Sequence, residues 1–295
     1  MADTPWGGGG DANPDKLYVQ SGQFSATLKT SRDISSLSGN NEGMDWDGTN
    51  TPWVGDGTAN KLFLQSGQFS ATLKTSFVTS SIDNGPRDIT WDGTNTPWVG
   101  QVDDKLYLQS GQFSATLKTS LSIGGVDTVP DGISFDGTNT PWAGNSANKL
   151  YLQSGQFSAT IKTSLGIGGI DVTPNDVSWD GTNTPWCGSS ANKLYLQSGQ
   201  FSATLKTSTA IGGIDGDPTG ITTSDVNARL GIPDVFTGTA AQTLPALEQL
   251  ATGILELAGI AVQTMPALSQ QAVGVLSALY CQTDFQVSND DGAGV

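Results

Sequence analysis

The residues that could carry chemistry recur in four copies of the phrase Asp-Gly-Thr-Asn-Thr-Pro-Trp. Each copy places a carboxylate and an amide three residues apart, at Asp47 and Asn50, Asp92 and Asn95, Asp136 and Asn139, and Asp180 and Asn183. An indole precedes three of the copies, at Trp46, Trp91 and Trp179, and Phe135 precedes the other. Carboxylate and amide groups beside an aromatic platform could bind a sugar.

The same residues are also typical of a tight turn. Asp-Gly favours a hairpin, because glycine tolerates positive φ and the aspartate side chain can accept hydrogen bonds from nearby backbone N–H groups. The indoles alternate with polar residues, so packing between repeats competes with a ligand-binding role. Two interpretations therefore stay open, namely structural hairpins or a ring of equivalent sugar sites.

Residues for catalysis are scarce in this 295-residue chain. It has no histidine, which removes the commonest general base and metal ligand and any triad built on it. Its two cysteines, Cys187 and Cys281, do not have the spacing of a zinc site. The adjacent aspartates at 103–104 and 290–291 are more typical of solvated loops than of paired catalytic carboxylates. We therefore expect no enzymatic activity, no metal and no cofactor.

Composition restricts the partners. Charged residues make up 14% of the chain and the formal net charge is −15, which argues against nucleic acid and anionic membrane surfaces. No apolar stretch approaches the ~20 residues that span a bilayer, so membrane insertion is not expected. The first ten residues lack the basic and apolar regions of a signal peptide. Cys187 replaces small apolar residues of the sister repeats, which predicts a small buried hydrophobe in a protein made in a reducing cytoplasm.

The elements that must position these residues are five near-copies of one unit. The sequence KLYLQSGQFSATLKTS, or a close variant of it, begins at Lys16, Lys61, Lys105, Lys149 and Lys193. The tryptophan of the Thr-Pro-Trp phrase, at Trp6, Trp53, Trp98, Trp142 and Trp186, recurs every 44 to 47 residues, a period that indicates a repeat architecture. Five near-copies favour a presented surface over one asymmetric active site.

One charge recurs in every unit. It is the lysine of the Thr-Leu-Lys-Thr-Ser phrase or its variant, at Lys29, Lys74, Lys118, Lys162 and Lys206. These lysines either solvate an outer strand and protect its edge, or form a cationic ring facing an acidic neighbour.

Each unit reads as four short strands. In the third, the period-2 alternation and the turn signals Asp92-Gly93 and Ser110-Gly111-Gln112 predict strands at 89–91, 96–99, 106–109 and 113–118. Four antiparallel strands in about 45 residues make one blade of a β-propeller. The sequence thus predicts an all-β, five-bladed propeller over residues 1–231.

The first unit lacks its opening strand, because Met1 leads almost directly to Trp6. Residues 220–227 match the opening strands of the other units, so we expect the strand near Ile221 to complete the first blade and close the ring. The Trp-Asp-Gly openings and Lys-Leu-Tyr strands resemble short-blade propellers of the NHL and tachylectin-like kind over residues 4–228. That resemblance implies a fold and no function.

The remaining segment, 232–295, has a different composition and its own repeat. GTAAQTLPAL at 238–247 and GIAVQTMPAL at 259–268 lie 21 residues apart. Strands are predicted at 254–257 and 273–276. A helix over 246–257 competes, although glycines at its borders would break it. We expect a mostly β segment that anchors the propeller or makes it oligomerise.

The sequence GTAAQTLPAL resembles a repeat common in structural proteins of tailed bacteriophages, and the resemblance covers about 50 residues. The second copy, GIAVQTMPAL, departs from it at three positions. The resemblance implies a virion protein, such as a decoration, tail or fibre component, made in the host cytoplasm and present in many copies. Other virion proteins, bound through 232–295, and a host-surface glycan would be its partners. The alternative is an extracellular, multivalent bacterial lectin. A synthetic consensus propeller is a third hypothesis, against which the irregular links after Arg32 and Phe77 argue.

Overall fold

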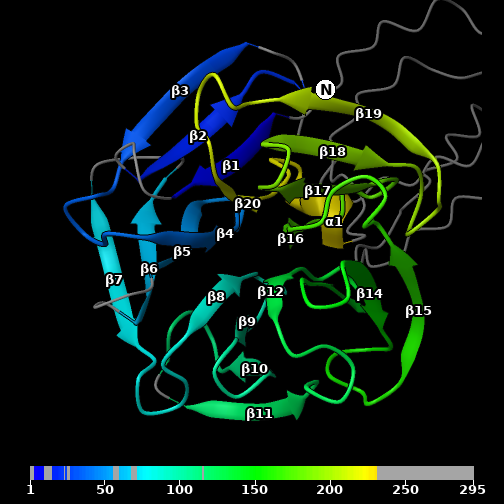
Figure 1. Ribbon diagram of the computed structural model, residues 1–295. Coiled ribbons are helices and arrows are strands. Elements are labelled where there is room, and N and C mark those ends of the chain that lie inside the picture. The colour runs from blue at the N-terminus through cyan, green and yellow to red at the C-terminus, as the bar shows by residue number, and fades with distance from the viewer. Residues whose placement is uncertain are drawn as a thin grey trace, which may run out of the picture. The chain divides into compact units, whose positions relative to one another are not determined.

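Five four-stranded antiparallel sheets surround a central axis in the computed structural model, which describes residues 3–9, 15–22, 24, 27–55, 60–67, 72–114 and 116–230 (Figure 1). The chain divides into two units, Met1–Ile232 and Pro233–Val295. The first unit is the propeller, which confirms the predicted all-β, five-bladed fold. The predictions for 232–295 and for Cys281 lie outside the described residues.

Each blade contributes one strand to each of four concentric layers. The innermost strands are β4 (Asn41–Met44), β8 (Pro86–Ile89), β12 (Pro130–Ile133), β16 (Pro174–Val177) and β20 (Pro218–Ile221). The second strands are β1 (Thr4–Gly8), β5 (Asn50–Gly55), β9 (Thr96–Gly100), β13 (Thr140–Gly144) and β17 (Thr184–Gly188). Nearly every residue of these two layers is buried, so the core of the molecule follows the axis.

The outer two layers differ in exposure. The third strands are β2 (Lys16–Gln20), β6 (Lys61–Ser66), β10 (Lys105–Gln109), β14 (Lys149–Gln153) and β18 (Lys193–Gln197). The outermost are β3 (Leu28–Asp33), β7 (Leu73–Val78), β11 (Leu117–Ser122), β15 (Ile161–Gly166) and β19 (Leu205–Ala210). The third strands are buried on both faces, whereas the outermost strands are exposed along most of their length.

The ring closes as the sequence predicts. The sheet of blade 1 has the order β20-β1-β2-β3, so its innermost strand comes from the far end of the propeller. Trp6 pairs with Ile221 and Gly7 pairs with Gly220 in antiparallel register. Blade 1 therefore joins the beginning and end of the repeat array within one hydrogen-bonded sheet, which protects edges that would otherwise be open.

A buried aromatic pair organises every blade. The tryptophan of each second strand stacks on the aromatic ring opposite it in the third strand, with ring centroids 4.0 to 4.2 Å apart. All five of these tryptophans are fully buried, and each cluster joins two neighbouring blades. Cys187 belongs to the cluster between blades 5 and 1 and is fully buried, as predicted.

Two strand boundaries differ from the sequence prediction. The strand predicted to include Trp91 ends at Ile89, and the strand predicted from Phe113 begins at Leu117. Phe113 has a φ of 63°, which an extended strand does not allow. Its ring packs instead against the cluster between blades 2 and 3, so an apolar residue that seemed to belong to a strand anchors a turn.

A tyrosine–aspartate hydrogen bond fastens the linker between blades in four of the five units. The tyrosine is on the third strand, and its hydroxyl donates to an aspartate of the linker that enters the same blade, in the pairs Tyr18–Asp215, Tyr107–Asp83, Tyr151–Asp127 and Tyr195–Asp171, at 3.0 to 3.3 Å. Burial and the neighbouring carboxylate raise the pKa of each tyrosine. In blade 2 both partners are replaced, by Phe63 and Ser38.

Removing one such hydroxyl should weaken the propeller modestly. We expect Tyr107→Phe to lower the free energy of unfolding by about 1 kcal/mol, because Asp83 keeps its bonds from the Gly85 and Asp103 backbone N–H groups. Urea unfolding of the full chain, followed by tryptophan fluorescence, measures the change. The double variant Asp83→Ser/Tyr107→Phe copies the pairing of blade 2, and it should cost less than the sum of the single variants. Additive costs would show that the two groups act separately.

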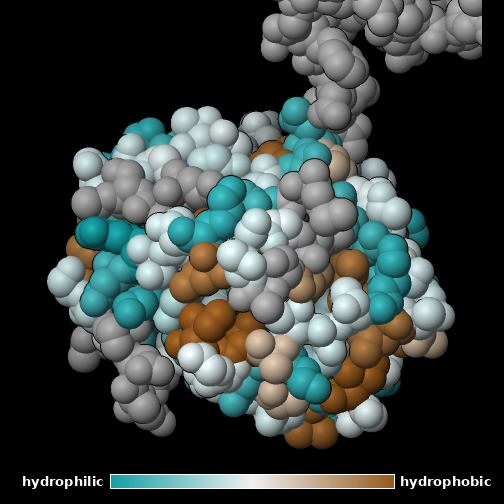
Figure 2. All heavy atoms as spheres, turned by 90° about the horizontal axis from the view of Figure 1, so that it is seen from above, coloured by the Kyte–Doolittle hydropathy of each residue, from teal (hydrophilic) through white to brown (hydrophobic). Residues whose placement is uncertain are grey.

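Within the described part of the chain, no helix has the length and apolarity needed to cross a membrane. Large apolar side chains that reach solvent, such as Val78, Val102 and Val172, are scattered over different blades. In the view of Figure 2, apolar residues accordingly form separate patches among hydrophilic ones.

Candidate functional site

The four Asp-Gly-Thr-Asn loops connect the innermost and second strands of blades 2 to 5 and show the predicted turn chemistry. Asp47 Oδ1 accepts the backbone N–H groups of Thr49, at 2.7 Å, and Asn50, at 2.5 Å. The side-chain amide of Asn50 donates to the other carboxylate oxygen of Asp47 at 3.3 Å. The loops of the other three blades repeat this pattern. The carboxylate therefore shapes its own loop.

The loops are also tied to their surroundings. A glutamine from the next blade donates to the loop carboxylate in the pairs Gln112–Asp47, Gln156–Asp92 and Gln200–Asp136. A lysine of the outermost strand donates to the loop amide in the pairs Lys74–Asn50, Lys118–Asn95, Lys162–Asn139 and Lys206–Asn183, at 3.2 to 3.3 Å. In blade 1, Lys29 pairs with Asp3 at 2.7 Å. Four of the recurrent lysines thus hold loops in place.

The three predicted indoles lie beside these loops and are half-buried. The Trp46 carbonyl accepts a hydrogen bond from Arg229, and the Trp91 backbone N–H donates to Asp45. They stand apart from the buried tryptophan stacks of the blades. The structure therefore gathers all predicted site residues at one end of the axis, and their role in sugar binding stays a prediction.

A short helix lies against the same loops. This helix, α1 (Val226–Leu230), follows β20, and we call its end of the axis the plug end. A Cβ atom at Gly181 would lie 2.8 Å from the Ala228 carbonyl oxygen, and one at Gly137 would collide with the Leu230 carbonyl. The match of residues 220–227 to an opening strand does not predict this helix. Its signal was Asp225, whose side chain caps it by accepting the Ala228 N–H at 3.0 Å.

The fit of α1 against the loops predicts a difference between two glycines. Gly137 and Gly111 have φ values of 90° and 59°, so alanine is strained at both. Only at Gly137 would the new methyl group meet α1, because a Cβ at Gly111 has nothing within 4 Å. We expect Gly111→Ala to cost about 1 kcal/mol and Gly137→Ala clearly more. Equal costs in urea unfolding would show that α1 does not depend on this contact.

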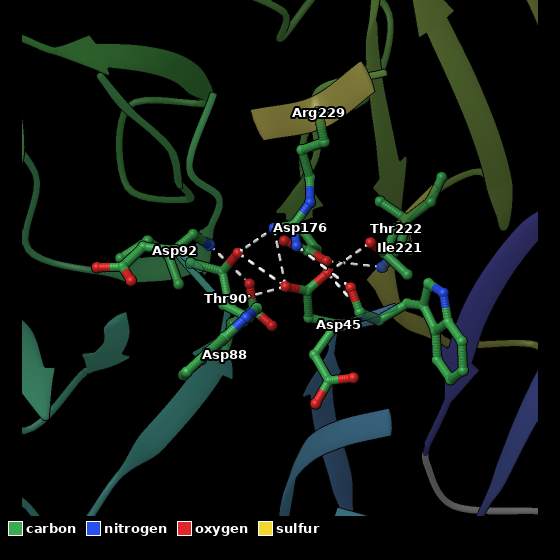
Figure 3. A network of polar contacts seen from close by, with 12 residues as sticks. Asp45, Asp88, Thr90, Asp92, Asp176, Ile221, Thr222 and Arg229 are labelled. Carbon is green, nitrogen blue, oxygen red and sulfur yellow. Dashed lines mark hydrogen bonds and ion pairs between the residues drawn. The ribbon is translucent and has the colours of Figure 1, made fainter. Parts of the chain in front are cut away.

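From α1, one guanidinium reaches the axis of the ring (Figure 3). Arg229 is fully buried and forms an ion pair with Asp45, with 2.8 Å between Nη1 and Oδ2. Arg229 also donates to Thr90 Oγ1, at 2.6 Å, and Asp45 accepts from Thr222 Oγ1, at 2.6 Å. The other four blades carry Thr or Ser at the position of Asp45, so only blade 2 offers the helix a carboxylate.

Two buried carboxyl groups form the next layer along the axis. Asp88 and Asp176 occupy a position that is glycine in the other three blades, and a Cβ at Gly43 would collide with Asp88. Asp176 accepts the Val177 and Ile221 N–H groups, each at 2.6 Å, and Asp88 accepts the Ile133 N–H at 2.6 Å. The glycines of the other blades therefore leave the space that this pair fills.

Burial is the main cause of the raised pKa values of these two carboxyl groups. It raises the pKa of Asp176 to about 8 and that of Asp88 well above its usual range. The hydrogen bond between the two side chains acts in opposite directions, raising the pKa of Asp88 and lowering that of Asp176. Asp176 accepts two backbone N–H groups and Asp88 accepts one, so Asp88 is the better placed of the two to carry a proton in the folded protein.

A polar cavity of about 290 Å³ lies at the opposite end of the axis, which we call the linker end. The second residues of the five innermost strands line it, and they are Glu42, Arg87, Asp131, Asn175 and Thr219. Glu42 and Arg87 form an ion pair at 2.6 Å, and Arg87 Nε donates to Gln101 at 2.8 Å. The five blades are near-copies, yet they carry five different side chains here.

Among the residues that line the cavity, Asp131 has a carboxyl group whose pKa is strongly shifted. Burial raises its pKa to about 7, although Arg87 and a hydrogen bond with Asn145 act in the opposite direction. The repeated residues predict neither this cavity nor the axial carboxyl groups. The sequence signal for both features is variation. At equivalent positions of otherwise near-identical blades, the side chain differs from blade to blade and is often charged. In the described residues, no three carboxylate or thiol groups gather as a metal site.

No protein-family model and no curated protein matches this chain. Among solved structures, a chain of a nidogen/laminin complex is 12% identical, with 76% of this chain and 98% of that chain covered and a TM-score of 0.48. A glutaminyl cyclase from Myxococcus xanthus is 12% identical, with 63% and 78% covered and a TM-score of 0.45. A virginiamycin B lyase from Staphylococcus aureus is 11% identical, with 71% of each chain covered and a TM-score of 0.42.

These matches correct one expectation. We expected no enzymatic activity from the missing histidine and the repeated architecture, but two of the solved structures are named as a cyclase and a lyase. Inferring the absence of catalysis from this architecture is therefore wrong. At identities this low the likeness concerns the fold, and it carries no reaction, substrate or partner over to this chain.

Proposed function

We propose that this protein is a structural component of a tailed-phage virion that displays the propeller as a recognition module and attaches it through the segment after residue 232. The observation that carries the proposal is the division of the chain into two units, Met1–Ile232 and Pro233–Val295. The second unit contains the 21-residue repeat that resembles phage structural proteins. Such a protein is made in the host cytoplasm and reaches the outside on lysis.

The closed ring supports this proposal. Because β20 pairs with β1, the propeller completes its hydrogen bonding before the second unit begins. A module of this kind can be carried by one connecting segment without leaving the inner edge of β1 unpaired. Many copies on one particle would multiply weak contacts with a host surface.

Particle labelling tests the proposal. An antibody against residues 1–232 should label purified particles of the phage that encodes this chain in immunogold electron microscopy. A phage whose gene ends after residue 232 should give unlabelled particles and leave the propeller free in the lysate. Full-length protein that stays in the lysate and never sediments with particles would overturn the proposal.

The second candidate is a multivalent lectin, found outside the cell. It is favoured by the exposed threonines Thr49, Thr94, Thr138 and Thr182, which repeat on the loops beside the half-buried indoles. A sugar would have to compete with Gln112 for Asp47 and with its counterparts in the other blades. Glycan-array binding of the full chain and of residues 1–232 tests whether the propeller binds a sugar, and the particle labelling separates a free lectin from a virion component. Saturable binding of one sugar class by both supports the lectin, and binding by neither argues against it.

A further inference from the structure

The cavity at the linker end is separate from the loops and α1 at the plug end. In blade 4, Asp131 is the second residue of β12, whereas Gly137 lies in the loop after that strand and faces α1. The innermost strand therefore runs from the cavity to the plug. The axial carboxyl groups and Arg229 lie between these two ends, so a ligand of the cavity would approach from the linker side.

The lining shows which ligands fit. It consists of carboxyl, amide and hydroxyl side chains with a single guanidinium, and it includes neither an aromatic nor an aliphatic residue. An apolar ligand would therefore find no partner there. The amides of Gln101, Asn145 and Asn175 offer both donors and acceptors for a hydrogen-bonding ligand.

The charged side chains of the lining indicate whether the cavity favours an anion or a cation. The cavity holds three carboxyl groups, Glu42, Asp131 and Asp217, and one guanidinium, Arg87. Arg87 is already bonded to Glu42 and Gln101, so its charge is largely balanced within the cavity. An anion would meet an excess of carboxylates, whereas a cation would be attracted.

We infer that the cavity binds a small organic cation, a primary ammonium or guanidinium group, with Asp131 as its ion-pair partner and the surrounding amides as hydrogen-bond partners. This inference does not depend on the virion proposal, because either outcome of the particle labelling leaves the cavity and its charge unchanged.

The state of Asp131 is consistent with such a ligand. Its carboxyl group is buried enough for its pKa to rise to about 7 despite Arg87 nearby. A ligand cation would favour the ionised form of Asp131, since a nearby opposite charge stabilises a buried carboxylate. Glu42 and Asp127 also face this carboxyl group and raise its pKa, and Asp217 lines the same cavity. We therefore place the binding assay at about pH 8.5, where an acid of this strength is ionised.

The test uses the full chain and four probes, namely agmatine, cadaverine, glucose and glutarate, in isothermal titration calorimetry. We expect agmatine or cadaverine to bind and glutarate not to bind. Asp131→Asn should weaken binding about tenfold or more, because it removes the ion pair while preserving the shape.

Asp103→Asn is the matched control. It also removes one carboxylate, from the β9–β10 turn, where the Asp103 side chain is 44% exposed and lies outside the cavity lining. We expect it to bind as the wild type does, and unchanged circular dichroism of each variant shows that the fold is kept. The inference fails if neither amine binds the wild type, if Asp131→Asn binds equally well, or if glutarate binds best.

The same chemistry could come from a free amine or from a basic side chain of another protein. An arginine or lysine flanked by blocked termini, as in N-acetyl-arginine amide and N-acetyl-lysine amide, distinguishes these sources. Binding of these compounds at least as tightly as agmatine and cadaverine indicates a protein partner. Binding of the free amines alone indicates a small molecule, and either result supports the cation site.

Discussion

Replacing Arg229 by methionine should lower the free energy of unfolding by about 3–5 kcal/mol, the largest loss we expect from one side chain of this propeller. The guanidinium is fully buried, and it balances Asp45, whose side chain is 4% exposed. Without it, a buried carboxylate keeps its hydrogen bonds but loses its only paired charge among the described contacts. Urea unfolding of the full chain, followed by tryptophan fluorescence, measures the loss.

Two variants show whether the loss comes from the ion pair. Asp45→Asn/Arg229→Met removes both charges, and we expect it to recover much of the stability, since no unpaired charge remains. Lys105→Met breaks an exposed pair with Asp103, at 3.2 Å, and should cost less than about 1 kcal/mol. If the double variant is no more stable than Arg229→Met, packing of the long side chain, rather than charge, accounts for the effect.

Replacing Asp88 by asparagine should stabilise the protein at pH 8, by on the order of 1–3 kcal/mol. The folded-state pKa of Asp176 is raised to about 8 and that of Asp88 lies well above its usual range, so the folded protein holds protons that the unfolded chain releases. The stability from this pair is therefore complete below about pH 4 and is lost as the pH rises toward 8 and beyond. An amide copies the protonated carboxyl group at Asp88 and avoids this loss.

The partner carboxylate should respond in the opposite way. Asp176 accepts two backbone N–H groups, so Asp176→Asn would set an NH₂ group against a donor and should destabilise the protein at every pH. Unfolding by urea at several pH values between 4 and 9 measures both variants. We expect the stability of Asp88→Asn to depend less on pH than that of the wild type. A steeper dependence, or a loss of stability at pH 8, would contradict the assignment of the proton to Asp88.

The repeated parts of the fold could be predicted from sequence because the same residue types make the same contacts in each blade. The tryptophan stacks, the Asp-Gly turns and the closing strand near Ile221 all belong to this class. Phe113 was placed in a strand because alternation alone cannot show a left-handed φ. The pairing of Arg229 with Asp45 could not be predicted, since the two residues meet only after the ring has closed. The helix α1 had only one local signal, the capping residue Asp225.

The candidate sites likewise include one that repeats and could be predicted and one that does not repeat and could not. The Asp-Gly-Thr-Asn loops were found because they repeat, and the structure shows each of their carboxylates in a turn. The linker-end cavity combines side chains from all five blades that have no common pattern. Only the order of the blades around the axis brings Glu42, Arg87 and Asp131 together.

The closing strand has a consequence for synthesis on the ribosome. Strands β1, β2 and β3 can pair as soon as they emerge, but blade 1 waits for β20, more than two hundred residues later in the chain. Until then the inner edge of β1 is an unpaired template beside four other blades of nearly the same sequence. Release of residues 218–221 from the exit tunnel is thus the event that commits the nascent chain to one ring, and a pause in translation before that point prolongs the period in which neighbouring chains can pair with it.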